Sequence, residues 1–500
     1  MILQTGIRET RSCLTIAACA AALSLTLAAT VSAQERQGGA GPGAQGPGAG
    51  ARFGGPGAAG GRFGGAGRGF GGAATNEPET RGLLTNTPDA TDGYTLFAPL
   101  NSTTSYLIDL EGNVVREWES EMVPSAWIYM LDNGDVLRGG REPVTSGFSG
   151  GGQGGRFQRF TFDGELIWDY SLNNDLQLPH HDVAVLPNGN LLAVVWEAMT
   201  EDETRTVGRR EAFIPDGGIW GDSVLELEPV GSDGARVVWE WHAKDHLVQD
   251  IDPDLPNYGN PADLPERIDI NGDIVGQTAP QGSPAQDVFH INSVAYNEDL
   301  DQIILSAPTF NEIWVIDHSV STAAAAGSGG DLLYRWGNPQ AYGRGTAEDT
   351  KLGFQHDAKW IPGGFPGAGN IMVFSNRTPG VGTEVLELES PVNRRGRYQI
   401  EDGEAYGPAD PVWAYSADDF SATYISGAVR LWSGDTLITS GPQGRLFEVD
   451  PDGNVVWDYW SPFDSNTDAE GAAPNPFAVF RAIRIPPDHP ALAGQELAPL

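Results

Sequence analysis

Cysteine is almost absent from this sequence. The only two, Cys13 and Cys19, lie in an apolar N-terminal stretch that follows two arginines and ends in the small-x-small motif Val31-Ser32-Ala33. This layout is typical of a secretory signal peptide, which we place at residues 1–33. We therefore expect an exported protein, periplasmic or extracellular. Cleavage after Ala33 would remove both thiols, which excludes disulfides, cysteine nucleophiles and cysteine-ligated metals from the mature chain.

Basic residues are also scarce. The chain has 30 Lys and Arg against 67 Asp and Glu, a formal net charge of -37. Such a charge repels nucleic acid and anionic lipid, so we expect neither as a partner. We expect no stable membrane insertion once the signal is cleaved. Residues 34–80 lack the branched apolar side chains that offset chain entropy, and we read them as a disordered Gly/Ala/Pro-rich tether.

Beyond the tether, short β-type runs that end in paired aromatic residues recur, often after Asp-Gly. Six copies occur: Leu110–Trp118, Asp163–Tyr170, Val237–Trp241, Leu333–Trp336, Pro411–Tyr415 and Asp452–Tyr459. Two or three further strand-like runs separate successive copies. A repeated unit of about four antiparallel strands indicates a β-propeller. We interpret the paired aromatics as packing of the outer strands.

The predicted fold is therefore all-β, a six-bladed β-propeller over residues 90–495. After the sixth aromatic pair, one strand-like run remains, at Phe480–Pro486. The first copy lacks a clear innermost strand. We predict that the C-terminal strand completes the first blade and closes the ring.

Three of the eight histidines share one position of the repeat. Counting back from the turn that follows each innermost strand aligns six opening positions: Ala126, His181, His290, His356, Ser426 and Phe480. Because these strands line the channel of a propeller, the three histidines should ring one of its mouths. Strand alternation places His180 on the opposite face, as a structural residue.

Other residues should join that mouth. Arg141, Pro308 and Arg377 follow the second strands of three blades, which end at the same face. The long segment Lys244–Asp287 directly precedes His290 and should lie over the same opening. It would be either a lid or a loop without a function.

These strand openings resemble the bacterial arylsulfate sulfotransferase family. The resemblance covers roughly residue 94 to the end and keeps the order of the motifs. The matching runs are His181 before Leu186-Pro187-Asn188, His290-Ile291-Asn292-Ser293-Val294, Gln355-His356-Asp357-Ala358, Val373-Phe374-Ser375-Asn376 and Phe480-Arg481-Ala482.

The resemblance implies an exported six-bladed propeller that moves a sulfuryl group from a phenolic sulfate ester to a phenol. By position, His356 would be the nucleophile that becomes sulfated. His181 and His290 would bind sulfuryl oxygens and carry protons. Substrate-binding candidates are Arg141, Arg377 and Asn292. The partners would be a small aryl sulfate donor and a phenolic acceptor, with no metal or other cofactor.

One position departs from the family, which places an arginine 18 residues after the second histidine. Here that residue is Pro308, which cannot bind an oxyanion.

Two other interpretations of the function stay open. Three neutral imidazoles around an axis can bind zinc with one open position, as in a hydrolase or lyase. A non-catalytic secreted propeller that binds a partner or a glycan is the third.

Overall fold

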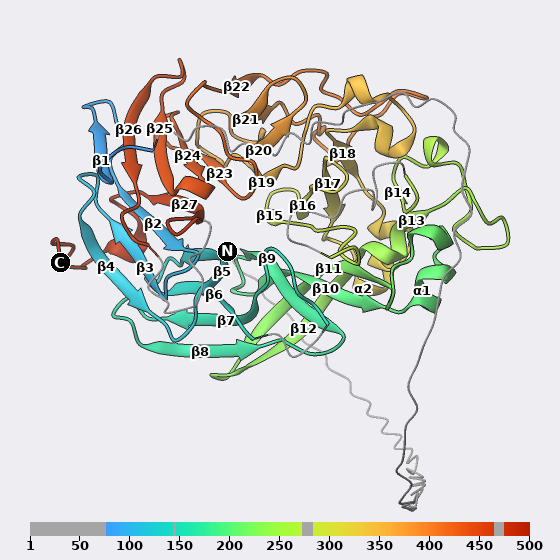
Figure 1. Ribbon diagram of the computed structural model, residues 1–500, viewed down its shortest axis with the longest axis horizontal. Helices are drawn as coiled ribbons and strands as arrows, with labels where there is room; N and C mark the ends of the chain where they lie inside the picture. The colour runs from blue at the N-terminus through green and yellow to red at the C-terminus, as the bar shows by residue number, and fades with distance from the viewer. Residues whose placement is uncertain (1–76, 144–146, 273–283, 465–474) are drawn as a thin grey trace, which may run out of the picture. The chain divides into compact units, whose positions relative to one another are not determined.

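The computed structural model describes residues 77–143, 147–272, 284–464 and 475–500. The predicted signal peptide and most of the predicted tether lie outside these residues. Within them, nearly all regular structure is β-strand. Six antiparallel sheets surround a central channel, as the sequence repeats predict (Figure 1).

Each sheet, or blade, runs from the channel outward. Blade 1 contains β27 (Val479–Ile485), β2 (Tyr94–Pro99), β3 (Thr104–Ile108) and β4 (Val114–Glu119). Blade 2 contains β5 (Pro124–Met130), β6 (Val136–Arg141), β7 (Gly155–Phe160) and β8 (Leu166–Ser171). Blade 3 contains β9 (Gln177–Val185), β10 (Leu191–Met199), β11 (Ile219–Val230) and β12 (Gly234–His242).

The second half of the ring follows the same order. Blade 4 contains β15 (Ser293–Asn297), β16 (Gln302–Ala307), β17 (Glu312–Asp317) and β18 (Tyr334–Trp336). Blade 5 contains β19 (His356–Trp360), β20 (Ile371–Thr378), β21 (Gly382–Leu388) and β22 (Trp413–Tyr415). Blade 6 contains β23 (Gly427–Arg430), β24 (Thr436–Ser440), β25 (Arg445–Val449), β26 (Val455–Trp460) and β1 (Gly82–Asn86).

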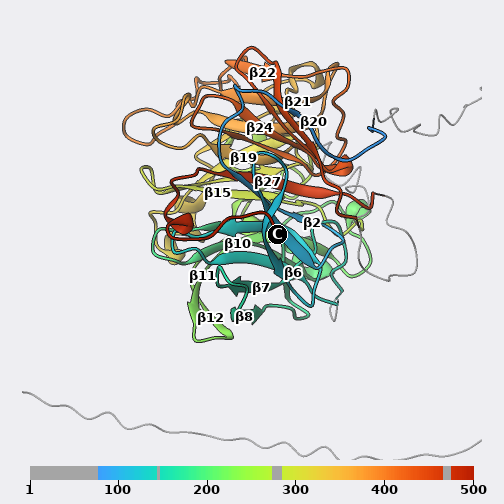
Figure 2. The ribbon, with the colours of Figure 1, turned by 90° about the vertical axis from the view of Figure 1, so that its left-hand side faces the viewer.

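The ring is closed by the C-terminal strand, as predicted. β27 pairs antiparallel with β2, with Tyr94 opposite Ile485 and Leu96 opposite Ile483. The two strands lie side by side although they come from opposite ends of the propeller sequence (Figure 2). The fifth strand of blade 6 was not predicted. β1 pairs with β26 and begins before residue 90, where we expected the propeller to start.

The repeated aromatic residues lie on the outermost strand of each original four-stranded unit. In every blade a tryptophan of this strand donates its indole N–H to a backbone carbonyl of the following blade. The six bonds are Trp118 to Thr161, Trp168 to Gly234, Trp239 to Val320, Trp336 to Pro408, Trp413 to Pro451 and Trp457 to Leu110. The repeated tryptophan therefore links each blade to the one that follows it, always in the same direction around the ring.

Two short helices, α1 (Glu201–Thr206) and α2 (Thr322–Ala325), lie between strands of blade 3 and of blade 4. A small parallel pair, β13 (Leu247–Val248) with β14 (Ile268–Asp269), belongs to the long connection from blade 3 to blade 4. No helix of the described residues combines the length and apolar character needed to cross a membrane.

Candidate active site

The three aligned histidines are buried at the openings of neighbouring inner strands. His181 lies within β9, His290 precedes β15 and His356 begins β19. Their exposures are only 2 %, 4 % and 2 %. His181 and His290 themselves have φ near +52° and +53°, whereas Phe354 and Asp357 flank His356 with φ of +52° and +56°. Non-glycine residues rarely adopt this conformation, and such backbone strain gathers at functional sites.

These backbone turns bring the imidazoles together. The rings of His181 and His290 pack edge to face, with centroids 4.5 Å apart. Phe480 of β27 lies 6.1 Å from the His181 ring and 5.8 Å from the His356 ring. Phe354 likewise lies 6.4 Å from His290 and 6.0 Å from His356. The structure thus gathers the predicted histidines into one cluster, with two phenyl rings between them.

His356 has a hydrogen-bonding pattern that fixes its tautomer. Its Nδ1 lies 2.7 Å from Oδ1 of Asn376 and 3.2 Å from the carbonyl of Phe354, and both atoms are acceptors. The Asn376 amide cannot be reversed, because its Nδ2 donates to the carbonyls of Ala422 and Ile425. Nδ1 of His356 therefore carries the proton and Nε2 is left with a lone pair. Burial lowers the pKa of His356 to about 3, so this ring is neutral near pH 7.

His290 forms a dyad with a carboxylate. Its Nδ1 lies 2.5 Å from Oδ2 of Asp287, which is itself buried. Oδ1 of Asp287 accepts a hydrogen bond from the indole of Trp196 at 3.2 Å. The carboxylate therefore orients the imidazole through Nδ1 and leaves Nε2 available for proton transfer.

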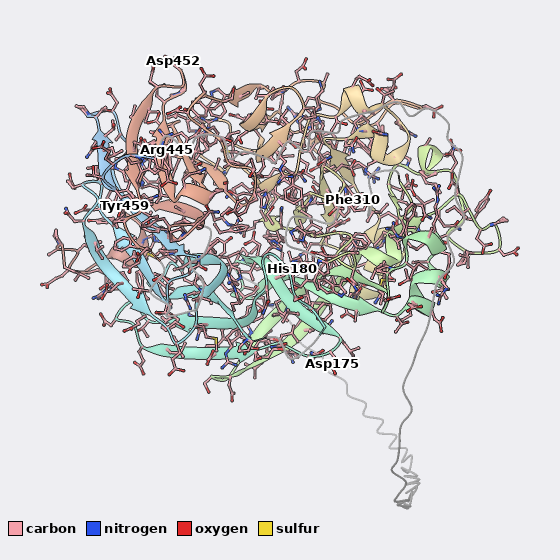
Figure 3. All side chains as sticks on the ribbon, viewed as in Figure 1. Asp175, His180, Phe310, Arg445, Asp452 and Tyr459 are labelled. Carbon is pink, nitrogen blue, oxygen red and sulfur yellow. The ribbon has the colours of Figure 1, made fainter. Side chains whose placement is uncertain are left out.

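His181 is held by its neighbour in sequence. The Nδ1 atoms of His180 and His181 are 2.8 Å apart, so the prediction that His180 points to the opposite face is wrong. The positive φ of His181 breaks the alternation on which that prediction relied. His180 stacks on Trp196 with centroids 4.2 Å apart, and its Nε2 lies 3.4 Å from Oδ1 of Asp222. It lies near the middle of the ring (Figure 3).

A buried layer of charge lies directly below the histidines. Arg481, the residue after Phe480, pairs with Asp182 and Asp357, the residues after His181 and His356. Lys359 also pairs with Asp357, at 2.7 Å, and Tyr129 donates to Asp182 at 3.0 Å. This network ties inner strands of blades 1, 2, 3 and 5 together across the channel. The sequence motifs contained Asp357 and Arg481, but nothing in the pattern predicted that they would meet.

The predicted arginines lie at the ends of β20 and β6. The Arg377 guanidinium covers the ring of Phe354, 4.8 Å from its centroid, and donates to the carbonyl of Thr423. Arg141 ends β6 opposite Gly155. Burial lowers the pKa of Arg141.

Asn292 has a structural contact at this site. Its Nδ2 donates to the carbonyl of Gln355 at 2.8 Å, next to His356, and the residue is fully buried. Its Oδ1 has no hydrogen-bond partner among the described residues. Pro308 follows β16, where its carbonyl accepts a hydrogen bond from the amide of Asn311 in a tight turn.

A glycine-rich loop covers part of the cluster. The amide of His181 donates to the carbonyl of Gly152 at 2.7 Å. A Cβ atom on Gly152 would lie 2.2 Å from the imidazole of His181, so only glycine permits this close approach. Phe148 anchors the same loop by packing against Trp196 and Trp220.

The described part of Lys244–Asp287 packs mainly beside blades 3 and 4. Leu247, Ile268 and Ile270 share a buried cluster with Trp241 and Phe310. Asp287 reaches the candidate site, whereas residues 273–283 of this segment lie outside the described residues.

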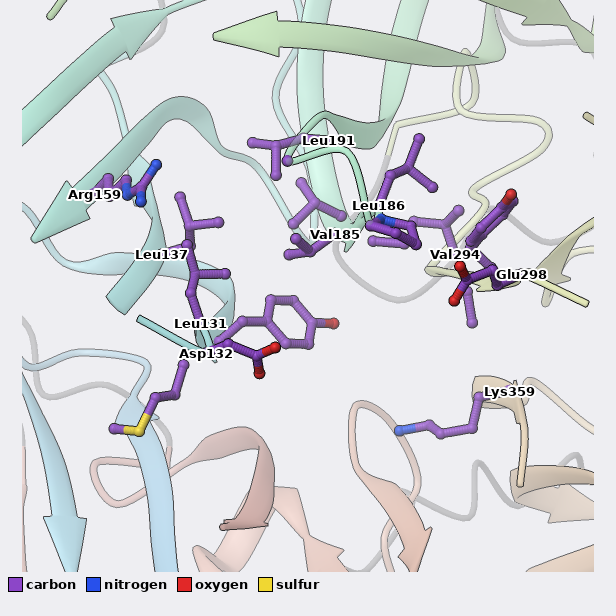
Figure 4. Close-up of a pocket in the computed structure, with 18 of the residues that line it drawn as sticks. Leu131, Asp132, Leu137, Arg159, Val185, Leu186, Leu191, Val294, Glu298 and Lys359 are labelled. Atoms are coloured by element: carbon purple, nitrogen blue, oxygen red, sulfur yellow. The ribbon is translucent and has the colours of Figure 1, made fainter. Parts of the chain in front are cut away.

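A separate cavity of about 760 Å³ opens at the other end of the channel (Figure 4). It is lined by the far ends of inner strands, including Leu131, Leu186 and Lys359, and by Asp357 and Arg481 of the charged layer. The histidines do not line it. The charged layer therefore separates this cavity from the imidazole cluster.

The arrangement does not favour the three-histidine metal site. Among residues 77–143, 147–272, 284–464 and 475–500, no group of three or more His, Cys, Asp or Glu side chains is placed to hold a metal ion. Phe480 also packs against both His181 and His356, with ring centroids 6.1 and 5.8 Å away.

Solved structures with a similar fold share little sequence with this chain. A protein of unknown function from Bacteroides caccae has 11% identity and a TM-score of 0.41, over 78% of this chain and 98% of that one. Virginiamycin B lyase from Staphylococcus aureus has 10% identity and a TM-score of 0.35, over 77% of this chain and 90% of that one. The periplasmic gluconolactonase PpgL of Pseudomonas aeruginosa has 13% identity and a TM-score of 0.37, over 79% of this chain and 99% of that one. Similarity at this level says nothing about function.

A comparison with curated proteins gave no match. The family model of arylsulfotransferase (ASST), in contrast, matches residues 85–456, from the end of β1 into β26. That span covers well over half of the sequence and contains all three clustered histidines. The chain therefore belongs to the arylsulfotransferase (ASST) family.

Proposed function

We propose that this protein is an exported arylsulfotransferase that moves a sulfuryl group from a phenolic sulfate ester to a phenol through a sulfohistidine at His356. The observation that carries the proposal is the pair of acceptors on Nδ1 of His356, Asn376 Oδ1 and the Phe354 carbonyl. They leave the lone pair of a neutral imidazole on Nε2, and neutral imidazole is a good nucleophile near pH 7. The family match supports small aryl compounds as substrates.

In the first half-reaction, Nε2 of His356 attacks the sulfur of the donor and the bond from sulfur to the phenolic oxygen breaks. The leaving phenolate takes a proton from Nε2 of His290, whose imidazolium is paired with Asp287. A phenol has a pKa of about 10, so protonation during departure makes this oxygen a better leaving group. The products are a sulfuryl group on His356, a free phenol and neutral His290.

In the second half-reaction, the acceptor phenol gives its proton to Nε2 of His290 as its oxygen attacks the sulfur. The bond from sulfur to Nε2 of His356 breaks, and the His290–Asp287 dyad returns to its protonated state. Neither half needs a nucleotide or a metal. Sulfuryl transfer, like phosphoryl transfer, depends mainly on in-line positioning and on donors around the three equatorial oxygens.

The family arginine is replaced by Pro308, so the oxygens need other donors. Arg141 is the predicted cation that remains for this role, and among the described residues no ion pair commits its charge to an acidic group. Arg377 is already committed to Phe354 and to the carbonyl of Thr423. We assign Arg141 to the sulfuryl group and Arg377 to positioning of Phe354.

The test is mass spectrometry of the mature chain after brief incubation with 4-nitrophenyl sulfate. We expect a sulfuryl adduct on the peptide that contains His356, and its transfer when a phenol is added. His356→Gln should abolish both. His318→Gln is the matched control, because His318 binds Asp301 and Glu226 outside the cluster. A wild-type protein that forms no adduct and transfers nothing would favour the non-catalytic propeller.

A further inference from the structure

The turn from β16 to β17 carries Pro308 and lies beside the imidazole cluster. Because β15 and β16 pair antiparallel, this turn is at the same end of blade 4 as His290. The amide of Phe310 donates to the carbonyl of Ala307, which makes Pro308 the second residue of a tight turn. Proline is favoured there because its ring presets the required φ. The residue at the position of the family arginine therefore contributes a rigid turn instead of a charge.

Two side chains of this turn reach the backbone next to two of the clustered histidines. The buried hydroxyl of Thr309 donates to the carbonyl of Phe289, directly before the proposed proton carrier, at 3.0 Å. Oδ1 of Asn311 accepts from the amide of Phe354, two residues before the proposed nucleophile, at 2.9 Å. One short turn therefore connects the strand opening of blade 4 to that of blade 5.

Both contacts act where the backbone is strained. His290 has a φ of +53° and Phe354 a φ of +52°, and such residues keep this conformation only where surrounding contacts hold them. The carbonyl of Phe354 accepts from Nδ1 of His356 at 3.2 Å. Its ring lies 6.0 Å from the His356 ring and 6.4 Å from the His290 ring. A displaced Phe354 would therefore move both an acceptor of the nucleophile and the ring next to the two imidazoles.

The neighbouring blade shows the same turn without these contacts. Pro379 of blade 5 and Pro442 of blade 6 are also the second residues of tight turns after the second strand. In blade 5 the side chain of Thr378 turns back to Ser375 of its own strand, at 2.6 Å. The proline is thus a repeated feature of the fold, whereas the two contacts made by the turn at Pro308 are particular to blade 4.

We propose that Thr309 and Asn311 are positioning residues that set the spacing between His290 and His356. One substrate must meet the attacking Nε2 of His356 and the proton on His290 together, so a small displacement of either ring slows the reaction. This inference rests on the proposed function for its chemical consequence. The spacing itself is a property of the protein without substrate.

The experiment is NMR of the whole mature protein with labelled Phe and His, recorded without substrate. Nuclear Overhauser effects (NOEs) from the Phe354 ring to His290 and to His356 report the spacing. Asn311→Gly should weaken both NOEs, because glycine suits the φ of +55° at this position but offers no acceptor. Thr309→Val should weaken only the NOE to His290. Asn311→Asp and Thr309→Ser keep the acceptor and the hydroxyl, and should keep both NOEs.

The same variants are then compared in single-turnover labelling by 4-nitrophenyl sulfate. Asn311→Gly and Thr309→Val should form the adduct about 10- to 100-fold more slowly, as expected for misplaced reacting groups. Asp301→Gly is the matched control and should leave the NOEs and the rate unchanged. Asp301 also has a positive φ, +51°, and accepts hydrogen bonds from Tyr296 and His318 away from the cluster.

Wild-type NOEs in either Asn311→Gly or Thr309→Val would overturn the proposal, as would a wild-type adduct rate in a variant with weakened NOEs. If only one of the two variants folds, it decides alone. Weakened NOEs in these variants, combined with a wild type that transfers no sulfuryl group, would support the spacing and refute the proposed function. The two failures are therefore distinguishable.

Discussion

Nδ1 of His356 lies 2.7 Å from Oδ1 of Asn376, while the amide nitrogen of Asn376 is held by two carbonyls of the loop before β23. The asparagine therefore presents an acceptor to the imidazole and cannot present a donor. A neutral acceptor also leaves the proton on Nδ1 when Nε2 gains a sulfuryl group. This contact makes the tautomer of the proposed nucleophile a property of the fold.

Asn376→Leu should slow formation of the sulfuryl adduct about 10- to 100-fold, by analogy with loss of the outer hydrogen-bond partner of a metal-bound histidine. Leucine has a similar size but removes the closer of the two acceptors on Nδ1, which leaves only the Phe354 carbonyl at 3.2 Å. The measurement is single-turnover labelling by 4-nitrophenyl sulfate. Asn370→Leu is the control, because Asn370 bonds Glu387 away from the cluster. An adduct rate equal to that of wild type would contradict the claim that Asn376 activates His356 by fixing its tautomer.

Asp287→Asn should affect poor leaving groups more than good ones. Proton transfer by a positioned acid contributes about 10²- to 10⁴-fold, and phenolate needs that proton far more than nitrophenolate does. We expect a loss of about 100-fold with phenyl sulfate and under about 10-fold with 4-nitrophenyl sulfate, measured as kcat/KM. Asp331→Asn, which alters a similar contact to His246, should change neither rate. Equal losses for the two donors would make Asp287 purely structural.

Arg481→Met should destabilise the protein strongly. The substitution leaves Asp182 buried without its cation and leaves Asp357 with Lys359 alone. Breaking a buried ion pair from one side costs about 3–5 kcal/mol, whereas an exposed pair contributes about 0–1 kcal/mol. Arg116→Met removes the surface pair with Asp163 and serves as the control. Urea unfolding of both variants should show the difference, and similar losses would argue against a structural charged layer.

Gly152→Ala should disturb the loop over His181. The added methyl group would lie 2.2 Å from the imidazole, and the φ of +79° is unfavourable for alanine. We expect a loss of about 1–3 kcal/mol in unfolding free energy, as for overpacked sites, together with a slower adduct reaction. Gly147→Ala is matched, since a Cβ there meets no atom within 4 Å. If the two variants behave alike, the close approach has no consequence.

Acid should weaken the fold through His356. Its pKa is about 3 in the folded protein, against about 6.5 in an unfolded chain. Between these values only the unfolded state binds the proton, so stability falls as the pH drops from about 6.5 towards 3. At pH 4.5 the loss for this one group is roughly 2–3 kcal/mol relative to pH 7.

His356→Gln removes that titration. The gap in unfolding free energy between wild type and this variant should therefore narrow by roughly 2–3 kcal/mol when urea unfolding is repeated at pH 4.5 instead of pH 7. A gap that stays constant over this interval would mean that His356 titrates alike in both states.

Much of the fold was predictable because its signals are local. Outer strands carry Trp and Tyr after tight turns, and Phe480–Pro486 is a strand with no partner left except blade 1. β1 was not predictable because Gly-Leu-Leu-Thr-Asn is too short to show alternation. Its pairing with β26 is long-range and leaves no periodic mark in the sequence.

The candidate site was predictable only in part. A shared register placed His181, His290 and His356 at one mouth, whereas the motif around Asn376 carried no sign of its role. Strand alternation misplaced His180, because the left-handed turn at His181 cannot be read from residue types. Asp222 and Asp287 lie in other segments, and only the folded ring brings them to the imidazoles.

The strand that closes the ring also completes its centre. β27 places Phe480 among the imidazoles and Arg481 beneath them, yet it follows every other blade in the chain. Until it docks, Asp182 and Asp357 face each other's charge without their shared cation, and β2 offers an open edge. A chain that folds in order from its first blades would therefore hold a nearly finished ring whose two central carboxylates lack that cation. Docking of the final strand would therefore complete the ring and the proposed active site in one step.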